Sequence, residues 1–576
     1  METLRHSAAH IMAAAVKDIW PNVKLAIGPA IDNGFYYDFD FGDTVINEND
    51  FAKIEKKMKS IIAQDLPFEK YEEDILKAID KEKQRGEIYK VELLEDLKSE
   101  GTQKVTYFKT GNFEDLCRGP HIKSSSEVKA FKLNKIAGAY WRGDENNKML
   151  TRIYALAFET EKDLNEYIEL LKEAELRDHR RLAKEFDLFS ISDKVGQGLI
   201  LWHPNLSKTR EVLETWWRKV HRQNGYHYVY TPHIGRSLLW QESGHLGYFK
   251  DSMFPPFSDK ETKDEYYIKP MSCPFHVEIY KSRRRSYRDL PIRWNELGTC
   301  YRYEKSGELH GLARPRGFTQ DDAHIICTKE QFKDEYRKVV ELTLGVFSNF
   351  GFTKFKYYLA ARDPKNLDQY VGDSDVWNIA EATIKEILVE KGIEYELEEG
   401  GAKFYGPALD IKIFDAIGRE WQCPTIQLDM NLPSKFNMTY IGPDGKDHTP
   451  IMIHRTIFGS LERFCTILIE HYAGAFPFWL SPIQIKIISV SDNHIDYCHK
   501  LSEELLQMDF RPQVDDASET VGNKIRKAVN EKVPYILVIG DKEMESGLLN
   551  VRERGSKNTY KISKEDFIKN IQSQIK

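Results

Sequence analysis

The sequence of 576 residues contains no uninterrupted run of about 20 apolar residues, the length that a membrane-spanning helix requires. Its first residues, Met-Glu-Thr-Leu-Arg-His, lack the apolar core of a secretory signal. The seven cysteines are odd in number and scattered, unlike the spacing of a small disulfide-rich domain. These absences predict a protein that has no membrane partner and works in the reducing cytoplasm.

A strong excess of one charge is also missing. The net charge is −7, and there is no internal repeat or low-complexity segment. A nucleic-acid partner would therefore have to be held by local rather than overall charge. With 41% hydrophobic and 30% charged residues the composition is globular, and the length predicts three or four domains.

The patterning divides the chain into three regions and predicts an α+β multidomain protein. Residues 1–180 mix helices and strands and end in a charged connecting helix, 160–188, with apolar residues at helical spacing. Residues 181–476 contain short strands in series, which predicts an antiparallel sheet flanked by helices. Residues 477–576 alternate strands and helices as βαβαβ, which predicts a small α/β domain with a parallel or mixed sheet.

Individual elements can be predicted from apolar periodicity. Helices are expected at 6–19, 50–64, 71–84, 205–224, 453–472, 495–508 and 522–532. Strands are expected at 34–41, 226–230, 411–414, 483–490, 511–514 and 535–539.

One segment, RYEKSGELHGLARPRGFTQDDAH, is richer in chemistry than any other. Arg302 and Glu304 lie on its first arm, and Arg314 and Phe318 lie on its return. Arginines on both arms can face one bound polyanion, because guanidinium groups offer fixed donors to phosphate oxygens. Phe318 adds a flat surface on which a purine could stack. The alternative is a charged surface hairpin without a ligand.

The order of residues in this segment resembles motif 2 of the class II aminoacyl-tRNA synthetases, and in detail that of the threonyl-tRNA synthetases of bacterial type. The resemblance implies that Arg302 contacts the α-phosphate of ATP and Arg314 the γ-phosphate. It also implies that Glu304 recognises the adenine amino group, that Phe318 stacks on the ring and that Gln422 belongs to the ATP site, with Mg²⁺ accompanying ATP.

Two further segments resemble the other motifs of this class. A predicted helix, 208–223, precedes a strand, 226–230, and Pro232, as in motif 1, which builds a homodimer interface in the family. The run IHRTIFGSLERF resembles motif 3, a strand leading into a helix, and places Arg463 against ATP. The implied catalytic residues are Arg302, Arg463 and His245. The role of His245 belongs to the transfer step and is given below.

The resemblance also implies one zinc site, whose ligands come from three separate segments of the chain. Cys273, His324 and His454 form a Cys-His-His set, which leaves one position open on a tetrahedral ion. The residues alone favour a buried thiol and two structural histidines, but the resemblance implies one zinc per subunit. Zinc can take both the amino group and the hydroxyl of threonine, which valine cannot match. Ser272 and Phe275 depart from the Asn and Gly of the family, which puts the packing of this loop in question.

The resemblance also implies the residues around the amino acid. Asp322 would hold the amine of threonine, with Gln320, Tyr405 and Gln427 around it. His245 lies where the family has a histidine near the terminal adenosine of tRNA, and it could pass a proton from the ribose hydroxyl. An isolated histidine is otherwise more often structural.

The first region contains a second set of histidines and a cysteine. His6 and His10 share one helix face, and Cys117 and His121 follow downstream in CRGPH. By themselves these residues indicate either a metal site or a pair of solvated histidines. The resemblance implies a third function, hydrolysis of Ser-tRNA(Thr), because serine keeps the hydroxyl and must be removed after transfer. Whether that pocket binds metal stays open. The implied editing residues are His6, His10, Lys90, Asp115, Cys117 and His121.

The third region resembles the anticodon-binding domain of the same subclass, in which Glu543 and Arg552 would read anticodon bases. Bacterial threonyl-tRNA synthetases usually begin with a small ubiquitin-like domain, and the resemblance implies that this domain is lacking here, by natural loss or by truncation.

The favoured function is therefore a threonine–tRNA ligase with L-threonine, ATP and tRNA(Thr) as substrates and a second copy as partner. A synthetase-like protein that binds tRNA without charging it, and a hydrolase that only edits, are disfavoured. Either would be expected to lose Arg302, Arg463 or a zinc ligand, and all are present.

Overall fold

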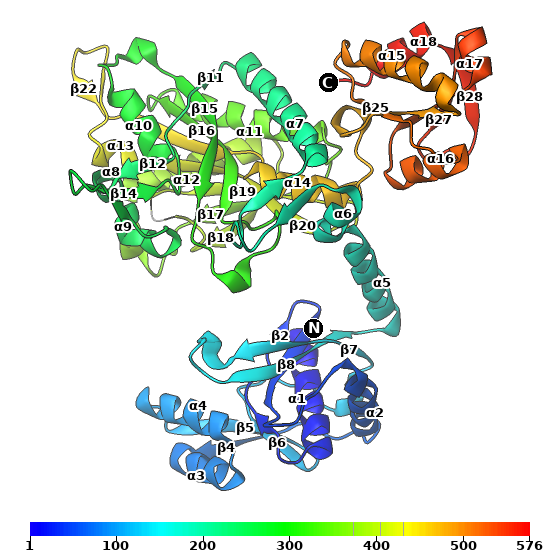
Figure 1. Ribbon diagram of the computed structural model, residues 1–576. Coiled ribbons are helices and arrows are strands. Elements are labelled where there is room, and N and C mark those ends of the chain that lie inside the picture. The colour runs from blue at the N-terminus through cyan, green and yellow to red at the C-terminus, as the bar shows by residue number, and fades with distance from the viewer. Residues whose placement is uncertain (372–373, 404, 430) are drawn as a thin grey trace. The chain divides into compact units, whose positions relative to one another are not determined.

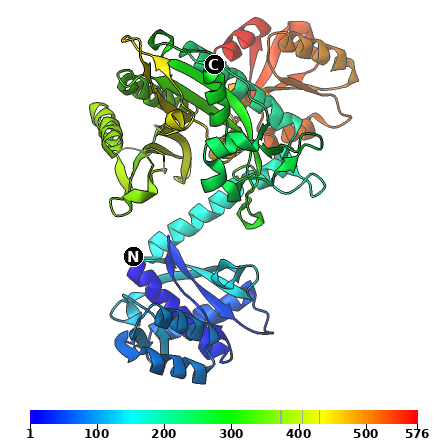
Figure 2. The same ribbon diagram turned by 90° about the vertical axis from the view of Figure 1, so that its left-hand side faces the viewer.

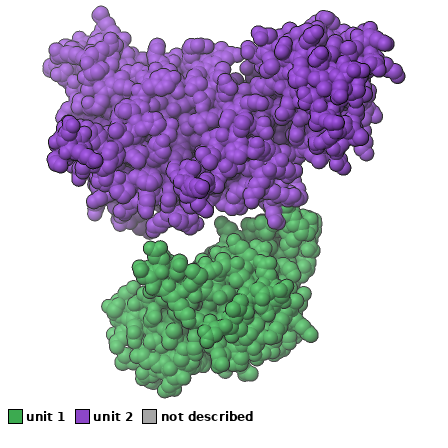
Figure 3. Space-filling model, viewed as in Figure 1, with its two compact units in different colours: residues 1–172 green, residues 173–576 purple. Residues whose placement is uncertain are grey.

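The computed structural model describes residues 1–371, 374–403, 405–429 and 431–576 (Figure 1). The chain forms two compact units, Met1–Lys172 and Glu173–Lys576, which are coloured separately in Figure 3. Figure 2 shows the course of the chain within each unit from a second side. Among the described residues, no helix combines the length and the apolar character needed to span a membrane.

The first unit contains a five-stranded antiparallel sheet. Its neighbouring strands are β1 (Lys24–Leu25), β3 (Gly34–Asp40), β8 (Met149–Phe158) and β7 (Ala130–Tyr140), with β2 (Ala30–Ile31) paired to β3. Helix α1 (Glu2–Ile19) contacts β3 and β8, and α2 (Phe51–Ile62) packs beside it. Ala8, Ala9 and Ala13 of α1 are fully buried, and their small side chains let the helix lie close to the strands.

A smaller antiparallel sheet completes this unit. It consists of β4 (Glu69–Asp74), β5 (Lys104–Thr110) and β6 (Phe113–Leu116), with helices α3 (Ile75–Arg85) and α4 (Ile88–Ser99) beside it. The helix predicted at 71–84 was wrong in its first turn, because residues 71–74 pair with β5. Asp74 ends that strand and caps α3, since its carboxylate accepts from the amide of Leu76 at 3.0 Å.

The connecting segment is two helices rather than the single one predicted. Helix α5 (Glu161–Arg177) and helix α6 (His179–Phe186) are separated by Asp178, whose ψ of 122° is not helical. The Asp178 side chain accepts from the amide of Arg180 at 2.8 Å and so caps α6. In a run of many charged residues, one capping aspartate gives no distinct sequence signal.

The second unit is built around an eight-stranded sheet, as predicted for the middle region. Its central neighbours are antiparallel, whereas the outermost strands at both edges pair in parallel. In spatial order the strands are β11 (His227–Tyr228), β15 (Ile292–Tyr301), β16 (Gly317–Cys327), β23 (Ile451–Thr456), β20 (Glu420–Asp429), β19 (Ala408–Phe414), β17 (Phe355–Ala361) and β18 (Glu396–Glu399).

One face of this sheet is covered by apolar packing. Ala323, Ile325 and Cys327 of β16 are fully buried in a core shared with helices α11 (Phe332–Ser348) and α12 (Ser374–Glu390). The alternate residues of β16, which include Asp322 and His324, must point to the opposite face because side chains alternate along a strand. The sheet therefore has an apolar core on one face and polar side chains on the other.

Two further long helices frame the sheet. Helix α7 (Pro204–Gln223) and helix α14 (Leu461–His471) share a second apolar core that includes Trp217 and Phe464. The prediction of one helix over 453–472 was wrong at its start, since residues 453–456 belong to β23. The motif 3 pattern, a strand followed by a helix, is the one observed.

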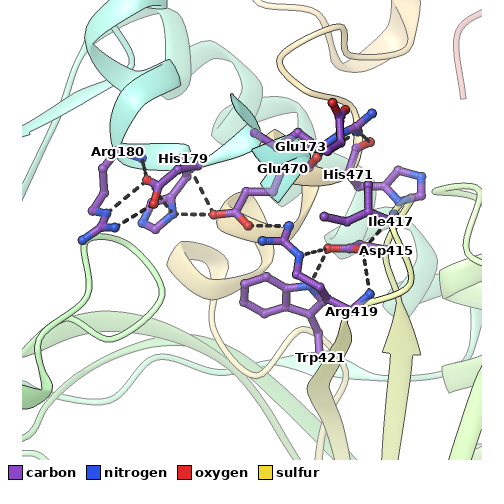
Figure 4. A network of polar contacts seen from close by, with 11 residues as sticks. Glu173, His179, Arg180, Asp415, Ile417, Arg419, Trp421, Glu470 and His471 are labelled. Carbon is purple, nitrogen blue, oxygen red and sulfur yellow. Dashed lines mark hydrogen bonds and ion pairs between the residues drawn. The ribbon is translucent and has the colours of Figure 1, made fainter. Parts of the chain in front are cut away.

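A buried polar network joins α6, α14 and the turn between β19 and β20 (Figure 4). Glu470 accepts from Nδ1 of His179 at 2.7 Å, and its other oxygen lies 2.6 Å from the Arg419 guanidinium. Arg419 in turn donates to Asp415 at 2.7 Å, and Trp421 donates to the same carboxylate at 3.0 Å. The Arg419 guanidinium thus accompanies both buried carboxylates, and the His179–Glu470 contact anchors α6 to the sheet domain.

The C-terminal part has the predicted βαβαβ order and a mixed sheet. Strand β24 (Ile485–Ser489) is parallel to β25 (Pro512–Asp515) and β26 (Tyr535–Ile539), and two antiparallel strands, β27 (Leu548–Glu553) and β28 (Thr559–Ser563), extend the sheet. Its helices are α15 (Ile495–Leu506), α16 (Val521–Asn530), α17 (Asp541–Ser546) and α18 (Lys564–Gln572).

Candidate active site and a second histidine–cysteine cluster

A pocket of about 460 Å³ opens on the polar face of the eight-stranded sheet. Gln320, Asp322 and His324 alternate along β16 and so face the same side. The strand register sets His324 opposite His454 on β23, and His454 opposite Gln427 on β20. Three neighbouring strands thereby present their polar residues at one place.

This pocket collects most of the residues expected around the amino acid. Its lining includes His245, Cys273, Arg302, Gln320, Asp322, His324, Tyr405, Gln427 and His454. Sequence reasoning missed Lys403, Asn431 and Lys435, which also line it. Single polar residues in loops or at the ends of a short helix give no sequence signal of this kind. The expected ATP residues Glu304, Arg314, Phe318, Gln422 and Arg463 are outside that lining.

The three expected metal ligands lie together in this pocket. Sγ of Cys273 and one ring nitrogen each of His324 and His454 are all within 4.8 Å of one another. Cys273 begins helix α10 (Cys273–Lys281) and is buried, as is His324. Nε2 of His324 is a buried atom with no hydrogen-bond partner among the described residues. One thiol and two imidazoles fit zinc with a coordination position left open.

Burial dominates the electrostatics of this cluster. It raises the pKa of the Cys273 thiol well above its ordinary value and lowers the pKa of His324 well below its own. It also raises the pKa of Asp322. A bound cation would favour the thiolate and neutral imidazoles, which are the forms that coordinate metal.

His245 is held beside the pocket as a neutral base. It begins the short helix α9 (His245–Tyr248), and its Nδ1 bonds to Ser243 Oγ at 2.7 Å. Burial, followed by the positive charge of Arg302, lowers the pKa of His245 to about 4. The ring is therefore uncharged at neutral pH and can accept a proton.

The arginine-rich hairpin has its own internal contacts. The Arg302 guanidinium lies over the rings of Phe249 and Phe318, 5.5 and 5.1 Å from their centroids. Arg314 is half-exposed and pairs with Glu304 at 2.9 Å and with a second glutamate. Exposed pairs of this kind are weak, so a nucleotide phosphate could replace the carboxylates.

Arg463 lies in the first turn of α14, at a helix start suited to phosphate. Ser460 caps the helix by accepting from the Arg463 amide at 3.0 Å. Gly459 has a φ of 75°, and a Cβ there would lie 3.2 Å from the carbonyl oxygen of Cys423, so only glycine fits comfortably. Nε of Arg463 is buried without a hydrogen-bond partner among the described residues.

The first unit contains the second cluster, which brings His6, His10, Cys117 and His121 within 4.8 Å of one another. Its donors bond to each other, since Sγ of Cys117 lies 3.0 Å from Nε2 of His6 and 3.4 Å from Nε2 of His121. His10 is 3% exposed and His6 is partly buried, which contradicts the alternative of a pair of solvated histidines. Burial raises the pKa of Cys117 to about 11 and lowers that of His121 to about 2, so both are uncharged at neutral pH.

An ion pair lies directly beside this cluster. Nζ of Lys90 is 2.6 Å from Asp115, and Asp115 also accepts from the Tyr37 hydroxyl at 2.5 Å. Nε2 of His10 is 4.0 Å from the same carboxylate. Tyr37 was missed from the sequence, because a tyrosine in a buried strand reads as core.

The expected anticodon residues make local contacts. Glu543 is nearly buried at the start of α17 and accepts from the amide of Gly540 at 3.1 Å. Arg552 on β27 donates to the carbonyl of Ser556 at 2.9 Å. Both contacts support the fold around these residues.

Comparison with known families covers each of the predicted regions. A model of the tRNA synthetase class II core domain (G, H, P, S and T) matches residues 256–472. A model of an anticodon binding domain matches residues 484–574, and one of the threonyl and alanyl tRNA synthetase second additional domain matches residues 105–154.

Curated relatives match along the whole length. A threonine–tRNA ligase of Sulfurihydrogenibium sp. is 48% identical over 577 residues, covering 100% of this chain and 89% of the relative. One of Borrelia turicatae is 48% identical over 557 residues, covering 96% of this chain and 93% of the relative. The chain belongs to the threonine–tRNA ligase family. The resemblance to class II synthetases is thus confirmed, as are its three kinds of domain.

Solved structures of this ligase family share the fold. A threonyl-tRNA synthetase structure from Cryptosporidium parvum, described as its RNA binding domain, has a TM-score of 0.66 at 35% identity, covering 69% of this chain and 98% of that one. A putative threonyl-tRNA synthetase from Aeropyrum pernix has a TM-score of 0.62 at 29% identity, covering 69% and 96%.

Proposed function

We propose that the chain activates L-threonine with ATP to form threonyl-adenylate and then transfers the threonyl group to tRNA(Thr). The observation that carries this proposal is the single pocket in which Cys273, His324 and His454 lie beside Asp322 and Arg302. It combines a candidate metal centre, an acceptor for an amine and a guanidinium for a phosphate. Membership of the ligase family supports the same reaction.

Cys273, His324 and His454 would hold one zinc ion per subunit, which when bound supplies a Lewis acid for the amine and the hydroxyl of threonine. Asp322 would accept a hydrogen bond from the amine. Tyr405 already donates to Gln427 at 2.6 Å, and this pair would orient the amino acid together with Gln320. Valine lacks the hydroxyl, so the pocket would discriminate against it strongly.

ATP, with Mg²⁺, would bind along the arginine-rich hairpin and the start of α14. Arg302 would contact the α-phosphate and Arg314 the γ-phosphate, after exchange of its exposed ion pairs. The remaining ATP contacts would come from Glu304, Phe318, Gln422 and Arg463. The buried, unpaired Nε of Arg463 supports a role for that side chain toward an anion.

His245 would accept the proton of the ribose hydroxyl of tRNA during transfer. Its lowered pKa supports this, since the ring is a free base at neutral pH. Its position in the lining of the same pocket as Arg302 supports a place near the reacting groups.

The cluster of the first unit would remove serine from Ser-tRNA(Thr) by hydrolysis. A thiol whose pKa is about 11 is a poor nucleophile at neutral pH, so water activated by a histidine is the better nucleophile. Lys90 and Asp115 would orient the ester or stabilise its developing charge. The match to the second additional domain supports editing here.

The remaining assignments follow from the family. Glu543 and Arg552 would contact anticodon bases, and α7 with β11 would form the interface of a homodimer in the cytoplasm. The proposed domains are 1–180 for editing with the connecting helix, 181–476 for catalysis and 477–576 for anticodon binding.

ATP–pyrophosphate exchange tests the proposal, with threonine, serine and valine compared in parallel. Threonine should support exchange, serine should do so at a few per cent or less, and valine should be nearly inactive. A protein that binds tRNA(Thr) but supports no threonine-dependent exchange would be the non-charging alternative.

A further inference from the structure

A line of buried polar side chains leads from His324 away from the pocket. Nδ1 of His324 lies 2.7 Å from Nδ1 of His276, and Nε2 of His276 lies 3.2 Å from Glu296. All three side chains are at most 3% exposed. We propose that His276 and Glu296 are positioning residues that fix His324 in the tautomer whose Nε2 lone pair faces Cys273 and His454.

The local fold explains why His276 is in place. It follows Cys273 by three residues on α10, so one turn of helix carries both the thiol and the second imidazole. The rings of His276 and His324 are nearly perpendicular, at 84°, with centroids 4.6 Å apart. An edge-on approach of this kind directs one ring nitrogen at the other.

The proton positions follow from what each group can donate. An ionised carboxylate only accepts, so Nε2 of His276 must carry the hydrogen directed at Glu296. With its one ring hydrogen on Nε2, His276 has a lone pair on Nδ1 and can only accept from His324. His324 must therefore be protonated on Nδ1, which leaves the lone pair on Nε2. This buried atom has no hydrogen-bond partner among the described residues and lies 3.7 Å from the Asp322 carboxylate.

Glu296 is itself held firmly in its ionised form. It accepts from the amide of Thr231 at 2.8 Å and from its hydroxyl at 2.9 Å. Lys269 is 1% exposed, lies 3.6 Å from Glu296 and donates to the same hydroxyl at 2.8 Å. Burial opposes the charge, but the His276 hydrogen bond and Lys269 hold the pKa of Glu296 below its ordinary value.

The other histidine of the cluster has an equivalent support. Nε2 of His454 lies 3.0 Å from Asp429, a fully buried carboxylate that also accepts from the amides of Asn431 and Leu432. By the same reasoning His454 carries its hydrogen on Nε2 and presents Nδ1. Carboxylates behind both imidazoles are the arrangement that orients histidine ligands and strengthens metal binding.

The inference rests on the proposed zinc site, and the experiment separates the two. Purified full-length holoenzyme is transferred to excess chromophoric chelator, and the rate of zinc release is measured with the zinc content per subunit. His276→Leu removes the relay, whereas His276→Gln keeps an amide oxygen for His324 and an N–H for Glu296. His494→Leu is the control, because His494 is also buried and bonded to a carboxylate at 3.0 Å, but in the C-terminal domain.

We expect His276→Leu to release zinc about 10–100 times faster than the unaltered chain. His276→Gln should release zinc at a rate close to that of the unaltered chain. His494→Leu should release zinc at the unaltered rate. Unchanged release from His276→Leu would overturn the inference. An unaltered chain that contains no zinc would instead refute the zinc site of the proposed function.

A second variant keeps the test decisive if His276→Leu does not fold. In Glu296→Gln the amide oxygen should keep the Thr231 contacts, so the NH₂ group faces His276. That N–H would donate to Nε2 of His276 and place the hydrogen of this ring on Nδ1, directed at His324. His324 would then carry its own hydrogen on Nε2, directed at Cys273 and His454. Zinc release should then be at least as fast as expected for His276→Leu, and unaltered release would overturn the inference.

Discussion

The two histidine–cysteine clusters contain the same chemical groups but differ in where the thiol and the imidazoles find their hydrogen-bond partners. In the second unit, the histidines are bonded to residues behind them, His276 and Asp429, and Nε2 of His324 has no hydrogen-bond partner among the described residues. In the first unit, Cys117 bonds to the ring nitrogens of two neighbouring histidines. The thiol of the first unit is thus hydrogen-bonded inside its own cluster, where Nδ1 of His10 is also a buried atom without a hydrogen-bond partner among the described residues. The hydrogen bonds of His324 and His454 run instead to residues outside the set of candidate ligands.

This difference teaches that residue types alone do not define a metal centre. The partners behind the ligands decide which atoms carry lone pairs and where these point. In the second unit, His276 and the Asp429 carboxylate lie behind the two histidines of the proposed zinc site. In the first unit, burial lowers the pKa of the three histidines and raises that of Cys117, so the cluster is uncharged beside the Lys90–Asp115 pair.

Removing the thiol from each cluster in turn should give the largest difference between the two clusters. Cys273→Ala should lose zinc and several kcal/mol of stabilisation, so threonine activation falls on the order of 10³-fold. Cys117→Ala should leave activation unchanged. Pyrophosphate exchange and elemental analysis measure both variants. Equal loss of zinc in the two variants would show that both clusters hold metal.

The complementary change tests the first cluster. His6→Ala combined with His10→Ala should slow deacylation of Ser-tRNA(Thr) about 100-fold or more, because a general base is lost. Charging with threonine should stay unchanged, since neither residue lines the pocket of the second unit. Radiolabelled seryl-tRNA measures the first effect. Deacylation at the unaltered rate would return this cluster to a structural role.

Acid should destabilise the first unit through its neutral histidines. Burial lowers the pKa of His121 to about 2, whereas the unfolded chain takes up that proton near pH 6.5. Stability is therefore full above about pH 6.5 and falls by about 1.4 kcal/mol per pH unit below it for each such histidine. Amide hydrogen exchange of β7 and β8 between pH 7 and 5, corrected for intrinsic rates, measures this. His121→Gln should reduce the dependence of the unfolding free energy on pH by the contribution of one histidine. An unchanged dependence would show that the pKa of His121 is not lowered by burial.

The smallest effect should come from the hydroxyl behind His121. Ser7 is fully buried, donates to the carbonyl of Thr3 at 2.8 Å and so accepts from Nδ1 of His121 at 2.9 Å. Ser7→Ala should remove a hydrogen bond worth about 1 kcal/mol, which orients the His121 ring. Deacylation should then slow about 3–10-fold, and threonine activation should not change. Ser99→Ala, at an exposed helix end, is the matched control. Loss of zinc from Ser7→Ala would contradict the separation of the two clusters.

The sequence was sufficient for the architecture and for much of the catalytic pocket. Apolar periodicity predicted the C-terminal βαβαβ order, and the arginine-rich segment with its three motifs predicted the class II sheet. The helix break at Asp178 and the strand at 71–74 were missed. Each depends on a single capping or pairing residue within a charged run, where tertiary contacts outweigh local pattern.

The polar supports of the two clusters could not be predicted. Glu296, Lys269 and Tyr37 lie in strands or next to one, and nothing in their spacing links them to the residues that they contact. Their roles follow from strand register and from hydrogen bonds that span 20–78 positions. Such pairings become visible only when the fold is known.

The network around Glu470 has a consequence for synthesis on the ribosome. His179 and its partner Glu470 are 291 positions apart, so at about 5–20 residues per second roughly 15–60 s separate their translation. The sheet of the first unit is complete once residue 158 has emerged, and that unit can fold in the interval. Helix α6 must instead wait with its histidine unpaired until α14 is made. A nascent chain stalled between residues 186 and 460 should therefore protect β7 and β8 from protease while α6 is still cut.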